Sequence, residues 1–359
     1  MIRYIVQRLL ASIPVLVGIL FVTFALARLL PSDPCRAALG ERATDTLCDA
    51  FIVRNGLDKP IPVQFAIYAR NILHGDLGNS FRYGRPVSDL LVERLPVTIE
   101  LALAALVFAT VFGVLLGTIS AVRRNSAVDV GTMLFANAGV SMPVFWLGLM
   151  LAYIFALLLK GTAFWLPPSG RNSPGLILPS LIEAWHLHVQ AGTAPYIILT
   201  FISNMHLVNS LLTGNWKAFG DTAQHLILPA LALGTIPLAL IARMTRSSLL
   251  EVLGQDYIRT ARAKGLTEKA IVLRHAMRNA MIPVVTIVGL SLGALLGGAV
   301  LTETIFNLSG VGRTLFDAIG ARDYTIVQAF TLVIAVIYVV VNLFVDILYI
   351  FLDPRIRLS

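Results

Sequence analysis

The chain has 359 residues, of which 57% are hydrophobic and only 13% charged, with a mean hydropathy of +0.80 and a net charge of +8. Ordinary soluble domains have about 25% charged residues, so the composition excludes a soluble protein and indicates a polytopic membrane protein. A helix needs about 20 apolar residues to cross a bilayer, because it must satisfy its own backbone hydrogen bonds in hydrocarbon. Long uncharged stretches therefore define the predicted architecture.

Six uncharged stretches are long enough to span the membrane, and we expect an all-α fold built on them. They are Leu9–Ala27, Leu101–Val122, Val130–Leu159, Thr222–Ala242, Asn279–Thr302 and Tyr324–Val345. A seventh uncharged stretch, 184–216, includes the apolar string YIILTFI but also histidine and asparagine residues. Composition alone therefore leaves the number of spans open between six and seven.

The charge distribution favours six spans. With the N-terminus inside, the inner segments have net charges of +2, +1, +5 and 0, whereas the outer segments together sum to zero. Basic residues prefer the cytoplasmic side, and a seventh span would place the basic stretch 243–278 outside. We therefore predict six spans with both termini cytoplasmic, and we interpret 184–216 as an outer helical insertion that lies partly in the membrane.

The N-terminal stretch, 1–30, has two interpretations. Its basic residues, its apolar core and the string ALA before Arg28 are also features of a secretory signal. The uncharged core, Leu9–Ala27, is longer than the roughly 7–15 residues of such a signal. We expect a retained first transmembrane helix, with a cleaved signal as the alternative.

The segment 31–96 is predicted to be an outer, periplasmic cap. It is rich in glycine, proline and aspartate, which favours turns that join short helices. The two cysteines of the chain, Cys35 and Cys48, both lie in it, on the oxidising side of the membrane. A disulfide between them is expected, and two unpaired thiols are the alternative. Residues 97–359 would form one transmembrane domain with an outer insertion at 160–221.

Glycines spaced four residues apart predict close helix packing. Gly289, Gly293 and Gly297 recur on one face of the fifth span, and Gly113 and Gly117 repeat the spacing in the second. Small residues let helix backbones approach closely in the membrane. This packing could form an interface that slides during function or a static contact within the chain.

Three prolines among those inside the proposed spans predict local breaks in helical hydrogen bonding. They are Pro143, Pro229 and Pro237. Such positions can act as kinks or hinges in a transport pathway, but membrane helices also tolerate proline without a functional role. Both interpretations stay open at this point.

Recognisable catalytic and metal-binding motifs are absent from the sequence. The chain has no Walker A sequence and no HExxH zinc motif, so we expect no catalytic residue, metal site or bound cofactor, and no nucleic acid partner. The proposed span interiors contain no Asp, Glu, Lys or Arg, whereas ion-coupled carriers usually bury such groups. The driving energy is therefore expected to come from outside the membrane portion, and no substrate-binding residue can be identified.

A basic string, RTARAKGLTEK at 259–269, interrupts the apolar chain within the inner stretch 243–278. The fourth span is compatible with helix continuing to Lys264, where Gly265 suits a helix stop and Thr267 a helix N-cap. The following EKAIVLRHAMRNAM can form a second helix that leads to Pro283. The pattern predicts a cytoplasmic helix–Gly–helix elbow that either only fixes topology beside anionic lipid or docks a partner.

The elbow resembles the coupling helix in membrane subunits of ABC importers, specifically the dipeptide/oligopeptide permease family. The general form of that loop is Glu-Ala-Ala, three residues, then Gly. Gly265 and Ala261 match this form, whereas Arg259 and Thr260 depart from it and the closing Leu-Pro is absent. The departure is typical of the peptide branch, which is similar to DYIRTARAKGL almost letter for letter.

The resemblance covers nearly the whole chain. Eight strings look like the first permease of that family, in the family's order: HGDLGNS, RLPVTIELALAA, SMPVFWLGLML, HLILPALALGTIPLA, RMTRSSLLEVLGQDYIRTARAKGL, LTETIFNLSGVGR, ARDYTIVQA and DPRIR. By resemblance, the residues that couple to the ATPase are Asp256, Tyr257, Arg259, Thr260, Ala261, Arg262, Lys264 and Gly265. The implied fold is the type I ABC importer permease fold.

The resemblance also implies partners and a function. It implies a heterodimer with a second permease in the bacterial inner membrane, two cytoplasmic ATPases that bind ATP and Mg, and an external binding protein that delivers di- or oligopeptides. This chain itself would then not be an enzyme. Relatives that carry nickel complexes, glutathione or other peptide-like solutes leave other substrates open, and an ion-coupled carrier or a structural scaffold are the alternatives from other classes.

Overall fold

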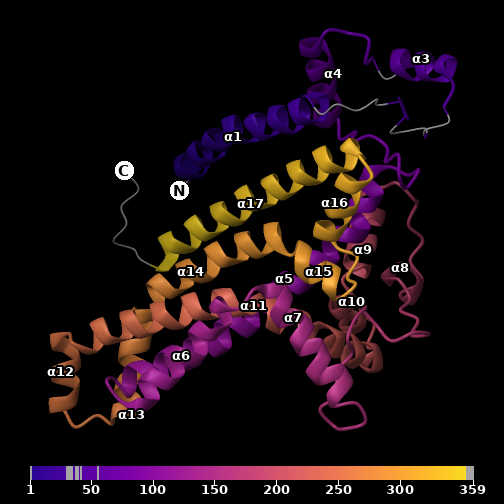
Figure 1. Ribbon diagram of the computed structural model, residues 1–359. Helices are drawn as coiled ribbons and strands as arrows, with labels where there is room; N and C mark the ends of the chain where they lie inside the picture. Colours follow the sequence, from indigo (N-terminus) through magenta and orange to yellow (C-terminus); the bar gives the residue numbers. More distant parts are fainter. Residues whose placement is uncertain (1, 30–34, 37–39, 41–42, 55, 353–359) are drawn as a thin grey trace. The chain divides into compact units, whose positions relative to one another are not determined.

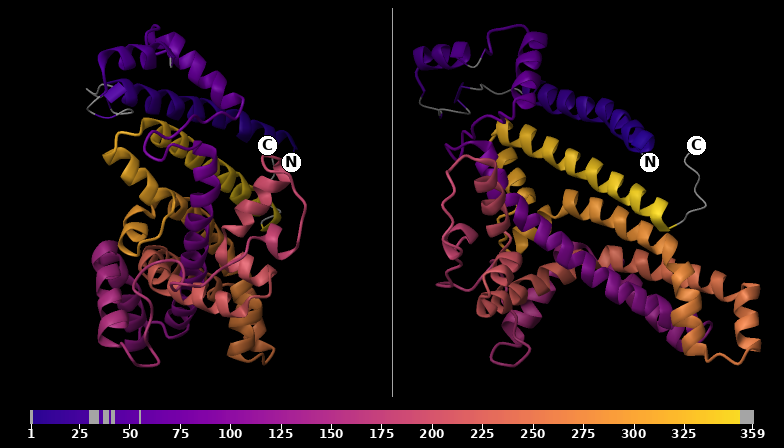
Figure 2. Two further views of the ribbon diagram at one scale, coloured as in Figure 1. Left: turned by 90° about the vertical axis from the view of Figure 1, so that its right-hand side faces the viewer. Right: turned by 180° about the vertical axis from the view of Figure 1, so that it is seen from behind.

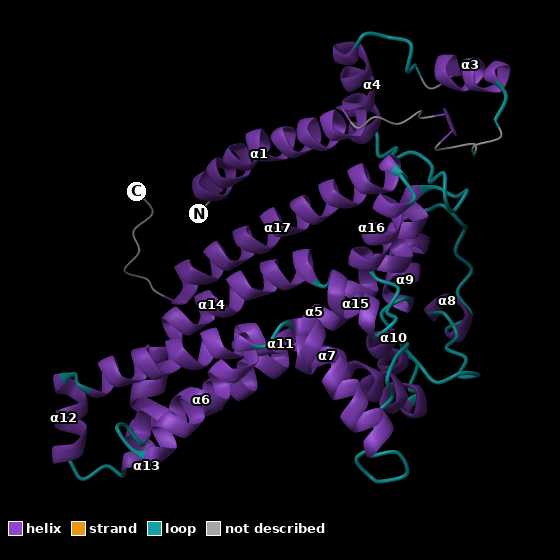
Figure 3. Ribbon diagram, in the orientation of Figure 1, coloured by secondary structure: helices purple, strands orange, loops and turns teal. Residues whose placement is uncertain are grey.

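The secondary structure is helical in the part of the chain that the computed structural model describes, which comprises residues 2–29, 35–36, 40, 43–54 and 56–352. Within those ranges no strand is formed, and β pairing is limited to an isolated bridge between Asn79 and Pro86 (Figure 3). The prediction of an all-α protein is confirmed. Figure 1 shows the helices in chain order.

The described residues form two compact units. The first contains 2–97, 179–205 and 309–339, and the second contains 98–178, 206–308 and 340–352. Helices of the first unit are α1 (Ile2–Leu29), α3 (Asp45–Arg54), α4 (Ile61–Leu73), α8 (Leu181–Ala184), α9 (Ala194–Ser203) and α16 (Val311–Gly320). The helices α5 (Val87–Val122) and α17 (Tyr324–Leu352) contribute residues to both units.

The second unit contains the remaining helices. They are α6 (Ala127–Ser141), α7 (Val144–Ala152), the π-helix η1 (Tyr153–Leu158), α10 (His206–Leu212), α11 (Trp216–Leu253), α12 (Asp256–Ala263), α13 (Glu268–Ala270), the π-helix η2 (Ile271–Ala276), α14 (Met277–Gly298) and α15 (Val300–Ile305). The long helices α11 and α14 run side by side in this unit, as the right-hand view of Figure 2 shows. A cluster of buried side chains from α5, α6, α11 and α14, including Ala109, Ala136, Ile241 and Val284, forms its core.

Five helical segments of the described chain are long and apolar enough to cross a membrane. They are Ile5–Leu26, Val87–Val122, Trp216–Leu253, Glu268–Gly297 and Tyr324–Ile347. Two bent helix pairs, α6 with α7–η1 and α9 with α10, would raise the number to seven if each pair counted as one span. The fold therefore supplies the predicted apolar helices, while the count of six stays a prediction.

The helix predicted at Leu101–Val122 is longer than the uncharged stretch. It begins at Val87 and runs without a break through Pro96. Val87 and Leu90 are fully buried against Phe330 of α17 and Val311 of α16. This packing stabilises the first turns of α5 although they contain charged residues. A prediction from uncharged stretches alone therefore begins the helix too late in the chain.

The third predicted span, Val130–Leu159, is broken in the structure. The helices α6 and α7 meet at an angle of 102°. Met142 is extended (φ −97°, ψ 132°), and Pro143 precedes the first turn of α7. Proline disfavours α-helical geometry in the residue before it, and at Met142 the backbone is extended, so Pro143 acts as a break. In contrast, α11 continues through Pro229 and Pro237.

The predicted outer insertion at 184–216 contains helices, as expected. The structure forms α8 just before it, then α9 and α10, which are bent by 101° relative to one another. Likewise, the fifth predicted span, Asn279–Thr302, is divided: α14 ends at Gly298, and α15 starts at Val300. The chain therefore changes direction more often than its uncharged stretches indicate.

Candidate functional site

The basic elbow consists of α12, a turn at Gly265, and α13. The prediction that the fourth span continues as helix to Lys264 is wrong, because α11 ends at Leu253 and α12 begins at Asp256. Gln255 between them is extended (φ −75°, ψ 152°), which breaks the helical path. As Figure 1 shows, α12 therefore forms a separate short helix at the end of α11. The break between α11 and α12 is not predicted from the sequence, because Gly254 is the sole residue there that indicates a helix end.

The stop at Gly265 has the geometry that the sequence predicts. Gly265 has φ +78°, a conformation that residues with a side chain rarely adopt. Its N–H donates to the carbonyl of Arg262 at 2.9 Å, and the N–H of Leu266 donates to the carbonyl of Ala261 at 3.3 Å. These two bonds form a Schellman-type helix end. Thr267 then caps α13 by accepting a bond from the N–H of Ala270 at 3.4 Å.

The helix α12 has one buried face and one exposed face. Ile258 is fully buried and Ala261 nearly so, in a cluster that includes Leu249 of α11 and Ile271 of η2. On the other face, the side chain of Arg259 is 81% exposed. The apolar face thus holds α12 against its own chain, and the polar face is left available to another molecule.

Polar contacts link α12 to α13 and to α14. The guanidinium of Arg262 donates to both carboxylate oxygens of Glu268, at 2.7 and 3.3 Å, and this pair raises the pKa of Arg262 above its ordinary value. Asn279 of α14 donates from Nδ2 to the hydroxyl of Tyr257 at 2.8 Å. Arg262 and Tyr257 therefore shape the elbow as well as lying on it.

The remaining predicted coupling residues are more loosely held. Arg259 and Asp256 lie 3.4 Å apart as an exposed pair, which contributes little to stability. The Thr260 hydroxyl donates to the backbone carbonyl of Asp256 at 3.1 Å. Lys264 ends α12 and is exposed, as is Gly265. All eight predicted residues thus lie on one short helix and the turn that follows it.

An ion pair between the half-buried Arg246 and the buried Asp129, which we call the inner clamp, holds α6 against α11. Arg246 donates from Nε and Nη2 to the two carboxylate oxygens of Asp129, each at 2.8 Å. The Ser120 hydroxyl and the N–H of Asn125 also donate to this carboxylate, whose side chain is 6% exposed. Sequence reasoning missed the clamp because nothing local links residues so far apart in the chain.

The glycines of α5 lie where the backbone of α11 comes closest. A Cβ added to Gly113 would lie 2.8 Å from Cγ2 of Ile241, and one added to Gly117 would lie 2.5 Å from the carbonyl oxygen of Ala242. Gly234 of α11 approaches the α5 backbone in the same way, at 2.8 Å, although the sequence spacing did not single it out. These positions mark a close helix pair within the chain.

The three glycines of α14 have different surroundings. Gly289 lies against Val345 of α17, so closely that an added Cβ would overlap its side chain. Gly293 is buried. Gly297 is exposed, and an added Cβ there would meet no atom within 4 Å. The shared spacing of the three therefore does not give them a shared contact.

A polar cluster ties the loop 159–178 to α5, α10 and α11. Glu100 of α5 accepts from Arg171 at 2.8 Å and from the N–H of Leu207 at 2.7 Å. Asp221 of α11 accepts from the hydroxyl and the N–H of Ser173, at 2.5 and 2.8 Å. We call this set the outer cluster. It lies at the end of α11 that is opposite to the elbow.

Buried carboxylates elsewhere in the described residues are also bonded. Glu303 accepts from the hydroxyl of Thr98 at 2.6 Å, and Asp323 accepts from the hydroxyl of Ser80 at 2.6 Å. With Glu100 and Asp129, these are the buried acidic side chains that the structure describes. Each accepts a hydrogen bond from a neighbouring group, as buried polar groups in folded proteins generally do.

An apolar pocket of about 230 Å³ lies between α7, α11, α14 and α15. Its lining includes Val144, Leu240 and Leu301. Ser291 and Thr302 supply hydroxyls, and Oγ1 of Thr302 is buried without a hydrogen-bond partner. The pocket is thus apolar with an unsatisfied polar atom in its wall, which the sequence gave no means of locating.

The predicted disulfide lies in the first unit. Cys35 and Cys48 are joined with a Cα–Cα distance of 5.3 Å, and both are buried. Cys48 belongs to α3, whereas the segment around Cys35 lies beside residues outside the described ranges. The bridge therefore fastens α3 to the start of the outer segment.

These features define a class: a multi-pass helical membrane protein whose α11–α14 pair carries an amphipathic elbow. Residues 113–358 match the family described as binding-protein-dependent transport system inner membrane component, and residues 1–102 match the N-terminal region of such membrane components. The chain belongs to this family. It is accordingly a permease subunit of ABC importers, located in the bacterial inner membrane, with the type I permease fold.

Several curated proteins are similar along their full lengths. The chain is 44% identical over 357 residues to the dipeptide transport system permease protein DppB of Alkalihalophilus pseudofirmus, covering 99% of this chain and 100% of that protein. It is 45% identical to the di/tripeptide transport system permease protein DppB of Pseudomonas aeruginosa and 43% identical to the dipeptide transport system permease protein DppB of Escherichia coli. Each of these two alignments covers 99% of both chains.

Proposed function

We propose that this chain forms half of the pathway of an ATP-driven importer for short peptides. The names of three full-length relatives specify dipeptides or di- and tripeptides. The family is that of binding-protein-dependent transport systems, and each buried acidic side chain described above accepts hydrogen bonds that fix its position. Energy is then supplied by other subunits of the importer, and this chain needs no cofactor of its own.

The proposed topology has six spans and cytoplasmic termini, with α6, α7 and η1 together as the bent third span. Net positive charge then lies on the cytoplasmic side, and the stretch 243–278 contributes most of it. In this topology the elbow is cytoplasmic. The outer cluster and the disulfide-linked segment lie on the opposite, periplasmic side.

The elbow is the proposed site at which the permease couples to an ATPase subunit. Its helix α12 buries Ile258 and Ala261 against the chain and presents Arg259 outward, so it is fixed on one side and free on the other. A helix of this kind can fit a cleft in an ATPase subunit. The bonds from Arg262 to Glu268 and from Asn279 to Tyr257 then transmit its movement to α14 as well as α11.

The partners follow from the family. We expect a second, homologous permease that completes the pathway, two cytoplasmic ATPases that bind ATP with Mg, and an external binding protein that delivers the peptide. ATP binding on the ATPases would favour one state of the permease pair and hydrolysis the other. This difference in affinity between states is what alternating access requires.

The pocket between α7, α11, α14 and α15 is the proposed wall of the peptide pathway. Apolar side chains such as Leu240 and Leu301 tolerate varied peptide side chains, whereas the unpaired hydroxyl of Thr302 can bond a group that every peptide has, its backbone amide. A buried polar atom without a partner is costly, so a passing ligand that satisfies it gains affinity. This arrangement fits broad selectivity among short peptides.

Charge reversal on the elbow tests the coupling. In the importer reconstituted with its partners, Arg259→Glu with Lys264→Glu should abolish peptide uptake while ATP hydrolysis and subunit assembly persist. Both side chains are exposed, so the substitutions leave the buried face of α12 intact. Uptake and ATP hydrolysis are measured in the same proteoliposomes.

The matched control is Arg124→Glu, which reverses an exposed charge in the neighbouring inner loop and away from the elbow. It should leave uptake unchanged, which separates a docking effect from a general effect of charge on topology. If the elbow variant retains uptake at the level of this control, the elbow does not couple the permease to ATP hydrolysis.

A further inference from the structure

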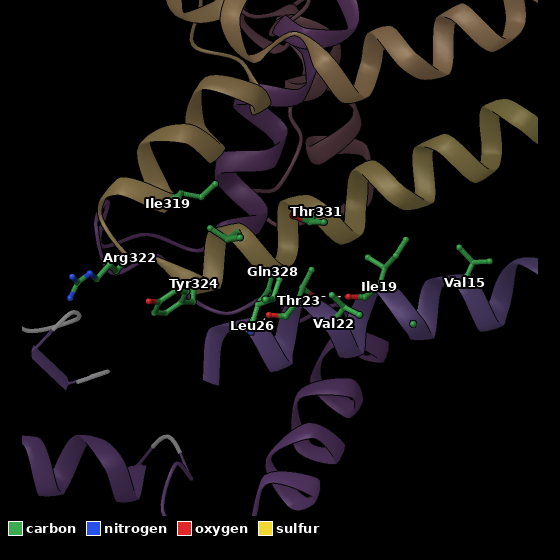
Figure 4. A pocket seen from close by; sticks show the side chains of 12 residues that line it. Val15, Ile19, Val22, Thr23, Leu26, Ile319, Arg322, Tyr324, Gln328 and Thr331 are labelled. Carbon is green, nitrogen blue, oxygen red and sulfur yellow. Dashed lines mark hydrogen bonds between the residues drawn. The ribbon is translucent and has the colours of Figure 1, made fainter. Parts of the chain in front are cut away.

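A large apolar slot lies between α1 and the first half of α17, within the first unit (Figure 4). Its volume is about 940 Å³, at the upper end of the roughly 300–1,000 Å³ of small-molecule sites. Apolar side chains such as Val15, Ile19 and Val22 line one wall. Both helices are long and apolar enough to span a membrane, which in the proposed topology places the slot at membrane depth.

The slot becomes polar at one end. Figure 4 shows Tyr324 beside Leu26 at the end of the slot away from Val15, with Arg322 beyond Tyr324 and its guanidinium pointing away from the slot. A smaller cavity of about 200 Å³, lined partly by α4, shares Arg322, Tyr324 and Gln328 with the slot. The two cavities together form one amphipathic site: an apolar slot between spans and a polar chamber beside the outer segment.

Two groups in the chamber have unused hydrogen-bonding capacity. The hydroxyl of Tyr68 is buried and has no partner in the described structure, while its ring stacks on Phe24 of α1. Burial raises the pKa of Tyr68 to about 12, so the phenol stays a neutral donor. Within the described residues, the exposed guanidinium of Arg322 makes no ion pair or side-chain hydrogen bond. Arg322 and Tyr68 both line the chamber, whose wall thus contains one cation and one orphaned donor.

We propose that this site binds a glycerophospholipid of the adjacent leaflet, with its acyl chains in the slot and its phosphate in the chamber, held by Arg322 and by the hydroxyl of Tyr68. Guanidinium groups bind phosphate through two parallel charge-assisted hydrogen bonds. The phosphate supplies the acceptor that Tyr68 lacks. The apolar part of the same ligand fills the slot.

The composite shape favours a phospholipid over a helix of another protein. A transmembrane helix would cover the apolar slot but would not place an anion at the level of Arg322 unless it carried an acidic residue there. A free phosphate would fill the chamber but leave the slot open. A ligand with an anionic group at one end and long apolar chains at the other satisfies both cavities at once.

Gly18 offers a way to close the slot without disturbing the fold. It lines the slot, and a Cβ added there would meet no atom within 4 Å. The large side chain of Gly18→Phe would occupy the space of the acyl chains. Arg322→Asn would remove the phosphate-binding charge, and asparagine tolerates the left-handed backbone of this position (φ +56°).

The assay is native mass spectrometry of the assembled importer, purified in mild detergent and supplied with phosphatidylglycerol. The wild-type complex should retain phospholipid after washing. Both variants should weaken retention by roughly tenfold or more, the effect of losing a charge-assisted contact or the chain-binding volume. Diacylglycerol, which has the chains but no phosphate, should bind as weakly to the wild type as phosphatidylglycerol binds to Arg322→Asn.

The controls are Val17→Phe, which adds the same ring at the neighbouring half-exposed position outside the slot, and Arg54→Asn, which removes an exposed charge from the outer segment. Both should retain phospholipid like the wild type, and size-exclusion profiles should show that all variants assemble. Equal retention in Gly18→Phe and Val17→Phe would overturn the proposal. So would a co-purifying polypeptide, in place of phospholipid, that Gly18→Phe displaces.

Discussion

The close approach of α5 to α11 predicts that adding a single methyl group to Gly117 destabilises the chain. In Gly117→Ala the new Cβ would lie 2.5 Å from the carbonyl oxygen of Ala242 and 2.7 Å from Cβ of Thr245. Neither is the end of a flexible side chain, so one helix must shift. Overpacking of this kind costs about 1–3 kcal/mol, whereas alanine gains about 0.5–1 kcal/mol over glycine in a helix.

The net expectation is a loss of about 1–2 kcal/mol, which corresponds to roughly a 5- to 30-fold decrease in the ratio of folded to unfolded protein. Gly297→Ala, on α14 of the same chain, is the matched control. A Cβ added at Gly297 meets no atom within 4 Å. It should be neutral or slightly stabilising. The assay is equilibrium unfolding of the purified chain in detergent, followed by circular dichroism.

The contrast between the two variants tests whether α5 packs closely against α11. A lower midpoint for Gly117→Ala with an unchanged or higher one for Gly297→Ala supports close packing within the chain. Equal midpoints would refute it. The same pair measured in the proposed heterodimer adds information about Gly297: a loss that appears only there would place the proposed partner permease against this face of α14.

Two further outcomes are expected. For the inner clamp, Asp129→Asn and Arg246→Gln should each lower the unfolding midpoint, and the double variant should lose less than the sum of the two; an additive double variant would show that the pair does not act as a unit. For the outer segment, alkylation of the unreduced protein should leave Cys35 and Cys48 unmodified, and both should react after reduction; modification without reductant would contradict the bridge.

The sequence predicts the elements that depend on local composition. Apolar stretches locate the membrane helices, and Gly265 with Thr267 locates the turn of the elbow, because helix ends are determined by nearby residues. The early start of α5 at Val87 depends instead on packing against α16 and α17, which are distant in sequence. Composition could not reveal that support.

In the candidate site, too, some features are predictable from local sequence and others depend on contacts between distant residues. The exposed face of α12 is readable from its charged residues, but the break at Gln255 is not, since a single glycine before it is a weak signal. The inner clamp requires Asp129 and Arg246 to meet across the fold, and the orphaned hydroxyls of Tyr68 and Thr302 become visible only when their surroundings are known. Contacts between distant residues are what one sequence does not supply.

The unbroken course of α11 has a mechanical consequence. Its 38 residues, at about 1.5 Å each, make a rod of roughly 57 Å that has the elbow at one end and Asp221 of the outer cluster near the other. Because Pro229 and Pro237 do not interrupt the rod, a tilt applied at the elbow is not absorbed along the way. A tilt of about 5° displaces the far end by about 5 Å, nearly one helical turn. In the proposed importer, a small stroke on the ATPase side would thus become a large displacement on the side where the peptide arrives.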